Sequence, residues 1–113
     1  MANSEKGEVS FEALGITWTL HFSTNALCEL EDASGKSAVE LANSLADESK
    51  AKISTLRLMV WAGLKSCHSD ITTEKTGDVI DAAGFDLIAS KIAKAFELAF
   101  PTTASIYFDY QRT

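Results

Sequence analysis

The chain changes character across the stretch Ser23-Thr24-Asn25-Ala26-Leu27-Cys28-Glu29-Leu30-Glu31-Asp32-Ala33-Ser34-Gly35. This stretch begins with hydroxyl side chains of the kind that cap a helix, and it ends on glycine, the residue that most often stops one. The apolar residues between these ends fall on one side of a short helix, which we expect over residues 24–34. The residues before it alternate as strands do, and most residues after it follow helical spacing. The sequence therefore predicts an α+β fold.

Two alternating segments, residues 8–13 and 16–22, predict an N-terminal antiparallel β-hairpin with Leu14-Gly15 as its turn. Their apolar residues share one face of the hairpin: Val9, Phe11, Ala13, Ile16, Trp18, Leu20 and Phe22. Because a lone hairpin is only marginally stable in water, this face must be covered. The predicted cover is the helix at residues 24–34, with its leucines set against the strands.

Two of the later helices carry clear terminal signals. Ser37 is the predicted N-cap of a second helix, and Glu40, three residues on, is its capping-box partner. Thr72 or Thr73 is expected to cap a short fourth helix that stops at Gly84.

The third helix is the predicted centre of the helical part, because apolar residues occupy most of its sides. We expect Ser54 to cap it and the helix to cover about residues 55–66. Gly63 lies in its middle, where glycine costs about 1 kcal/mol relative to alanine, and this predicts the close approach of another backbone. A fifth helix over about residues 86–100 ends at Pro101.

The composition fits one domain: 113 residues, of which 46% are hydrophobic and 23% charged. We expect a disordered arm at residues 1–6, a single domain at residues 7–101 with the hairpin packed on four to five helices, and an aromatic tail at residues 102–113. The tail alternates in the manner of a strand. It is expected either to add a strand to the hairpin or to dock on another subunit or partner by strand addition.

The formal net charge of −6 argues against nucleic acid and against an anionic membrane as partners, because both need clustered Lys and Arg. The longest apolar run, residues 58–64, is too short to cross a bilayer, and the polar N-terminus does not resemble a signal peptide. A cytoplasmic location, in a bacterium or an infected cell, is expected.

The residue types and spacings predict no catalytic site, no metal site and no cofactor. His68, Ser69 and Asp70 have the side chains of a hydrolytic triad, but neighbours in sequence cannot point at one another as a triad requires. The carboxylates of the helix at residues 24–34 diverge instead of converging on a metal. Cys28 and Cys67 lack metal-ligand spacing and are expected to be buried thiols. We therefore expect a protein that is not an enzyme.

Aromatic and apolar side chains exceed what the predicted core obviously needs, and such residues often anchor protein interfaces. Simple core packing is the alternative interpretation, and it is favoured for Trp18 and Phe96. We predict a partner-binding groove between the third and last helices, extended by the tail. Its predicted residues are Trp61, Leu64, Phe96, Phe100, Ile106, Phe108 and Tyr110.

The order of several segments is also informative. A strand opening at Gly7-Glu8-Val9 is followed by Trp18-Thr19-Leu20 and by the helix Ala26-Leu27-Cys28-Glu29-Leu30-Glu31, which runs to Gly35. Further on come Ala62-Gly63-Leu64, Asp78-Val79-Ile80-Asp81-Ala82-Ala83-Gly84 and a closing Ala95-Phe96. In this order, over about residues 7–100, the chain resembles the gene transfer agent family of small phage proteins. That family is grouped with phage tail assembly chaperones and is also labelled as tail tube proteins.

The resemblance implies a non-enzymatic role in building the tail of a phage or a phage-like gene transfer agent. A chaperone of this class binds the tape measure protein, a very long helical chain, and keeps it soluble until tube subunits polymerise around it. The alternative is a structural tail tube or tube-joining subunit that stays in the virion. Other tail proteins, or a second copy bound through the tail, are further partners to consider. A tube subunit normally needs a larger sheet than one hairpin supplies, and this favours the chaperone.

Overall fold

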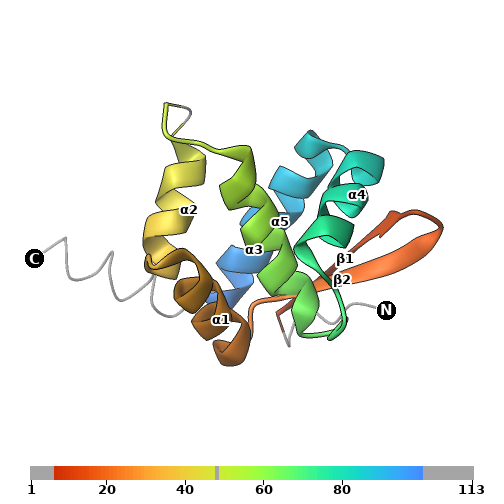
Figure 1. Cartoon of the computed structure of the whole chain (residues 1–113), viewed down its shortest axis with the longest axis horizontal. Coiled ribbons are helices and arrows are strands. Elements are labelled where there is room, and N and C mark those ends of the chain that lie inside the picture. The colour runs from red at the N-terminus through yellow and green to blue at the C-terminus, as the bar shows by residue number, and fades with distance from the viewer. Residues whose placement is uncertain (1–6, 48, 101–113) are drawn as a thin grey trace, which may run out of the picture.

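The alternating segments at the start of the chain form a two-stranded antiparallel sheet, and five helices follow in the described part of the chain (Figure 1). The structure is a computed structural model, and it describes residues 7–47 and 49–100. The strands are β1 (Glu8–Ala13) and β2 (Ile16–His21). The helices are α1 (Thr24–Ser34), α2 (Ala38–Ala46), α3 (Ile53–Lys65), α4 (Thr73–Ala83) and α5 (Phe85–Ala99). The predicted α+β fold is confirmed. The arm expected at residues 1–6 and the tail and strand expected at residues 102–113 lie outside the described residues.

The hairpin is closed by a tight turn at Leu14 and Gly15, both of which have positive φ, at 57° and 70°. Two such residues in succession match the turn twist that suits a two-residue hairpin. The indole nitrogen of Trp18 donates a hydrogen bond to the carbonyl oxygen of Ala13, 2.9 Å away, within the buried face. Ile16 was expected on that face but is 51% exposed, because it adjoins the turn at the end of the hairpin (Figure 1).

Helix α3 lies at the centre of the core, as its apolar sides predicted. It contributes six buried residues, and it contacts β2 and each of the other helices. The apolar face of the hairpin is covered by α3, α4 and α5. The expectation that α1 provides this cover is wrong: α1 packs mainly on α3. Only two residues separate β2 from α1, so α1 begins beside the end of the strand and leads away from the sheet (Figure 1).

Gly63 permits a close approach, but the side chains of Leu20 in β2 and of Phe22, just after β2, make it, and not the backbone predicted from the sequence. A Cβ atom at this position would lie 2.9 Å from Cδ2 of Leu20 and 3.0 Å from Cζ of Phe22. Both distances are shorter than ordinary contacts between carbon atoms. The missing side chain therefore lets the strand and the helix pack directly on each other.

Three of the predicted helix caps are present. The side-chain oxygens of Ser23, Ser37 and Thr72 each accept a hydrogen bond from the backbone N–H three residues on. The predicted cap at Ser54 is wrong: α3 begins two residues earlier than predicted, at Ile53, and Lys52 stands at the N-cap position without a side-chain hydrogen bond. Ser54 thus lies inside the first turn, where its hydroxyl cannot act as the cap.

Candidate partner-binding groove

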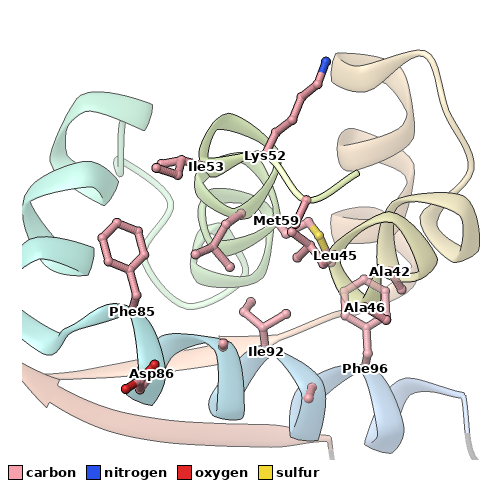
Figure 2. A pocket seen from close by; sticks show the side chains of 14 residues that line it. Ala42, Leu45, Ala46, Lys52, Ile53, Met59, Phe85, Asp86, Ile92 and Phe96 are labelled. Atoms are coloured by element: carbon pink, nitrogen blue, oxygen red, sulfur yellow. The ribbon is translucent and has the colours of Figure 1, made fainter. Parts of the chain in front are cut away.

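An apolar groove of about 540 Å³ lies between α2, α3 and α5 (Figure 2). Its floor is formed by buried side chains of α3 and α5, namely Leu56, Met59 and Ile92. Phe85 and Phe96 project from α5 toward opposite ends of the groove (Figure 2). The two rings are eleven positions apart along the helix, a rise of about 16 Å or three turns. The groove therefore has the length of a short helix or of a few extended residues.

Small side chains keep the groove open. Five alanines line it: Ala42, Ala46, Ala51, Ala89 and Ala93. The methyl side chains of these alanines are too short to fill the space between α2 and α5, so the two helices face each other across a gap. The stripe of α2 explains this geometry, because its first half, including Ala38 and Leu41, is buried, whereas its second half is only partly covered. The groove is the place where the apolar stripe of α2 lacks a partner within the described fold.

Two large apolar side chains at the groove are exposed to water over about half of their surface or more. Ile53 is 70% exposed and Phe85 is 47% exposed. Scattered exposed apolar residues are normal on a protein surface, but these two adjoin a continuous apolar lining. Among the described residues that line the groove, the charged ones are Lys52 and Asp86. The combination favours an apolar occupant over a charged one.

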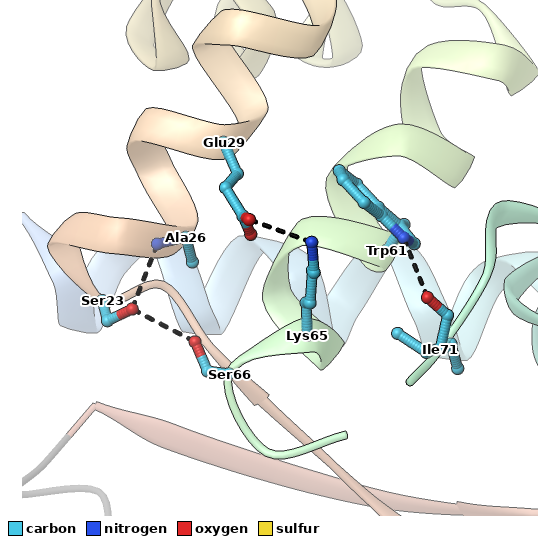
Figure 3. A network of polar contacts seen from close by, with 7 residues as sticks. All are labelled: Ser23, Ala26, Glu29, Trp61, Lys65, Ser66 and Ile71. Atoms are coloured by element: carbon cyan, nitrogen blue, oxygen red, sulfur yellow. Dashed lines mark hydrogen bonds and ion pairs between the residues drawn. The ribbon is translucent and has the colours of Figure 1, made fainter. Parts of the chain in front are cut away.

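The structure brings together only part of the predicted binding set. Phe96 lines the groove, and Phe100 stacks on it with ring centroids 5.8 Å apart. Leu64 is fully buried, so its predicted role as a surface contact is wrong, and it belongs to the core. Trp61 lies two residues from Met59 and thus on another side of α3, where its indole nitrogen donates to the carbonyl oxygen of Ile71 at 3.1 Å (Figure 3). The predicted residues Ile106, Phe108 and Tyr110 lie outside the described residues.

Sequence reasoning missed the exposed rim residues and the alanines, although a signal for them was present. Positions 85, 89, 92, 93 and 96 repeat at the spacing of one helical face, and positions 42, 45 and 46 do the same in α2. An apolar helical stripe that contains alanines is compatible with a packed core face, so the spacing by itself does not indicate a groove. Only the relative placement of α2 and α5 shows that these two faces meet with a space between them.

A second hollow, beside α1 and the end of α3, contains hydroxyl groups that have structural roles. The hydroxyl of Ser66 donates to the carbonyl oxygen of His21 at 2.9 Å, which commits its proton. The hydroxyl of Ser23 must therefore donate across the 3.1 Å to Ser66, while it accepts from the backbone N–H of Ala26 (Figure 3). Each hydroxyl is used in tying α1, α3 and β2 together. The arrangement leaves neither serine paired with a base.

An ion pair supports the same junction. The ammonium group of Lys65 lies 2.9 Å from a carboxylate oxygen of Glu29 and 5.0 Å from the ring centre of Trp61 (Figure 3). Both charged side chains are partly exposed, so the pair contributes less than about 1 kcal/mol. It links α1 to the end of α3 and carries no sign of a catalytic role.

His68 is also used structurally. Its Nε2 atom accepts a hydrogen bond from the backbone N–H of Thr19 at 3.1 Å, and its ring lies against Trp18 with centroids 4.9 Å apart. Burial lowers the pKa of His68, which favours the neutral ring that this hydrogen bond requires. The imidazole thus covers part of the outer edge of β2. Ser69 and Asp70 are exposed beside it, while the Nε2 atom of His68 is occupied by the backbone N–H of Thr19.

Both cysteines are exposed, which corrects the expectation of buried thiols. Helix α3 ends at Lys65, so Cys67 lies in the turn after the helix and no longer on its apolar face. Partial desolvation, and secondarily the carboxylate of Glu8, raise the pKa of the Cys67 thiol. On α1, Cys28 points away from the side that carries the buried Ala26 and Leu30.

Within residues 7–47 and 49–100, no group of three or more histidine, cysteine, aspartate or glutamate side chains is placed to hold a metal ion. In the same residues, no helix combines the length and the apolar character needed to cross a membrane. The apolar groove is therefore the strongest candidate site in the described part of the chain.

No protein-family model, curated protein or solved structure matches this chain. The groove, together with the order of segments described above, supplies the grounds for a function.

Proposed function

We propose that this protein is a non-enzymatic assembly protein of a phage tail or a phage-like tail, and that it acts as a chaperone for the tape measure protein. The groove between α2, α3 and α5 is the observation that carries this proposal. The resemblance to the gene transfer agent family supplies the class of partner. The chaperone would act in the cytoplasm before the tail is complete.

The shape of the groove fits an amphipathic helix. Helix-in-groove recognition places apolar side chains from successive turns of a partner helix into a hydrophobic channel. The span of about 16 Å between Phe85 and Phe96 accommodates side chains from about three turns. Alanines on both walls let the backbone of a partner helix come close. A tape measure protein, as a very long helical chain, would present many such segments.

A small-molecule ligand fits the groove less well. Ligand pockets have similar volumes, but they also place several polar groups to orient the ligand. Here the described lining is apolar except for Lys52 and Asp86. An apolar stripe on a polypeptide needs no such orienting groups, because its own backbone hydrogen bonds are satisfied within the helix.

Each binding event is expected to be of modest strength. Covering the exposed parts of Ile53 and Phe85 contributes on the order of 1–2 kcal/mol for each side chain. Association itself costs several kcal/mol in lost freedom of motion, so a single groove gives moderate affinity. Many copies along one long partner would nevertheless cover it, which is the mode of action that a chaperone for a polymer-length substrate needs.

The test is co-expression with a tape measure protein, a long helical phage tail protein, using variants in which a single alanine, in the groove or elsewhere, is replaced by glutamate. Ala46→Glu and Ala93→Glu put a charge in the groove. Ala33→Glu and Ala82→Glu put the same charge on exposed positions of α1 and α4. All four variants change the net charge and the helix propensity equally.

We expect the wild type and both control variants to keep the partner soluble, and both groove variants to leave it in the pellet. Circular dichroism and urea unfolding must show that the groove variants remain folded. Solubilisation by the groove variants at the wild-type level would refute binding in the groove. Abundant copies of this chain in purified mature tails would instead favour the structural subunit.

A further inference from the structure

We propose that the chain's own C-terminal segment, residues 102–113, docks in the groove between α2, α3 and α5 and competes there with a partner. The inference rests on the proposed function in taking this groove as the binding site. It concerns the isolated chain, however, and it can be tested without any partner. The segment would act as an internal occupant that a partner helix must displace.

The first argument is where the described chain ends. Helix α5 lines the groove along its length, and Phe100 at its C-terminal end stacks on Phe96, which stands at one end of the groove. Pro101 follows and cannot continue the helix. The segment therefore starts at the mouth of the groove, beside one of its lining residues.

The second argument is length. An extended chain covers about 3.3 Å per residue, so the seven steps from residue 101 to residue 108 cover about 23 Å. Helix α5 rises by the same distance, about 23 Å, from Phe100 back to Phe85. A segment that turns back at Pro101 and runs antiparallel to α5 would bring Phe108 to the far end of the groove, with five residues to spare.

The third argument is the match of side-chain sizes along that path. Residues 102–105 are Thr, Thr, Ala and Ser, and they would pass over the part of the groove that includes Ala93. Ile106 would follow beside Ala89, and the large residues Phe108 and Tyr110 would reach the end where Ile53 and Phe85 are left exposed. Small residues thus meet the alanine-lined section, and large residues meet the uncovered apolar rim.

Charge is compatible with the same path. Asp109 and Arg112 are the charged residues of the segment, and Lys52 and Asp86 are the charged residues of the described groove lining. The segment and the groove lining thus each carry one positive and one negative side chain. Lys52 and Asp86 are the sequence neighbours of Ile53 and Phe85, so the charges of the lining lie at the exposed apolar end of the groove. No unpaired like charges are forced together. The alternation of Ile106, Phe108 and Tyr110 places all three on one face of an extended segment, as docking on a single surface requires.

An internal occupant has a calculable effect on a partner. A short tether gives an effective concentration of about 1 mM. If the untethered segment binds with a Kd of about 0.1 mM, the tethered segment fills about nine grooves in ten. The apparent affinity for a partner then falls about tenfold. Substitution of the apolar residues of the segment should therefore raise the apparent affinity for a partner about tenfold.

The experiment uses the full chain labelled with ¹³C in its alanine methyl groups. The test variant is Ile106→Ser/Phe108→Ser/Tyr110→Ser, and the matched control is Tyr107→Ser, which alters the opposite face of the same segment. Ala46, Ala89 and Ala93 report on the groove, while Ala33 and Ala82 on exposed surfaces of α1 and α4 serve as references.

We expect the test variant to shift the groove methyl signals and to leave the reference signals in place, and we expect the control variant to change neither. A synthetic peptide of residues 102–113, added to the test variant, should return the groove signals toward their wild-type positions. The wild-type signals should not depend on protein concentration.

Identical groove signals in the wild type and the test variant would overturn the inference. Wild-type groove signals that move on dilution would also overturn it, because the segment would then dock on a second copy. If the NMR experiment gives the expected shifts but the protein does not solubilise the tape measure protein, the internal docking stands and the proposed function is refuted. If the protein solubilises the tape measure protein but the groove signals do not shift, the chaperone function stands and the internal docking is refuted.

Discussion

Replacement of Gly63 by alanine tests the close contact between α3 and β2. In most helices this change is stabilising by about 1 kcal/mol, because glycine is a poor helix former. Here the added methyl carbon would lie 2.9 Å from Cδ2 of Leu20 and 3.0 Å from Cζ of Phe22. Carbon atoms in contact prefer about 3.5–4.0 Å, so both side chains must move by about 0.5–1 Å.

That movement has little room. Leu20 is 0% exposed and Phe22 is 4% exposed, and the ring of Phe22 packs on the ring of Phe96 with centroids 4.4 Å apart. Overpacking of a well-filled core costs about 1–3 kcal/mol. After the helix-propensity gain of about 1 kcal/mol, we expect Gly63→Ala to destabilise the protein by up to about 2 kcal/mol.

Gly77→Ala provides the matched control. Gly77 lies in the middle of α4, and a Cβ atom there would meet only Cδ of Arg57, at an ordinary 3.8 Å. This variant gains the same helix propensity without the overpacking, so we expect it to be stabilised by about 1 kcal/mol. The difference between the two variants isolates the cost of the contact with β2, about 1–3 kcal/mol.

Urea unfolding followed by circular dichroism measures both variants. With a slope of about 1–2 kcal/mol per molar urea, a difference of this size separates their midpoints by about 0.5–3 M. If Gly63→Ala is as stabilising as Gly77→Ala, the packing of β2 directly on α3 at this glycine is refuted.

Three further predictions concern single side chains. Because the pKa of His68 is lowered in the folded protein, the unfolded chain binds more protons, so the free energy of unfolding should fall between about pH 8 and pH 5. His68→Gln keeps an acceptor without the titration, and urea midpoints at the two pH values should differ less than in the wild type. Ser37→Ala should cost about 1 kcal/mol in urea unfolding through loss of the α2 cap, whereas Ser54→Ala should cost less than about 0.5 kcal/mol. Ellman's reagent should titrate both Cys28 and Cys67 in the native protein, and protection of either thiol until unfolding would contradict the exposure of both. The reaction of Cys67 should become fast only at a pH above that at which a free thiol reacts, because burial raises its thiol pKa.

Local sequence signals were sufficient for the elements themselves. The alternation in residues 8–13 and 16–22 specified both strands and their shared apolar face. Capping hydroxyls at Ser23, Ser37 and Thr72 marked the starts of three helices. Each signal involves residues within about four positions of one another, and a short stretch of chain is enough to satisfy it.

The predictions that proved wrong depend instead on contacts between residues that are far apart in the sequence. The exposure of Cys67 depends on α3 ending at Lys65, two residues before this cysteine, and the burial of Leu64 depends on which helices surround α3. The cover of the hairpin by α3, α4 and α5 could not be inferred, since the apolar stripe of α1 fits a strand face as well as it fits another helix. Periodicity shows that a face is apolar, but it does not identify the element that covers that face.

The sequence by itself determined the hairpin, the order of the helices and the central position of α3, because local periodicity and terminal residues fix these features. Only the tertiary structure decided where a partner could bind. The groove exists because α2 and α5, nearly forty residues apart in the chain, face each other across α3 with alanines on both sides. Small side chains on a helical face are compatible both with tight packing and with an open space. The distance between the helices decides between the two, and a single helix does not encode that distance.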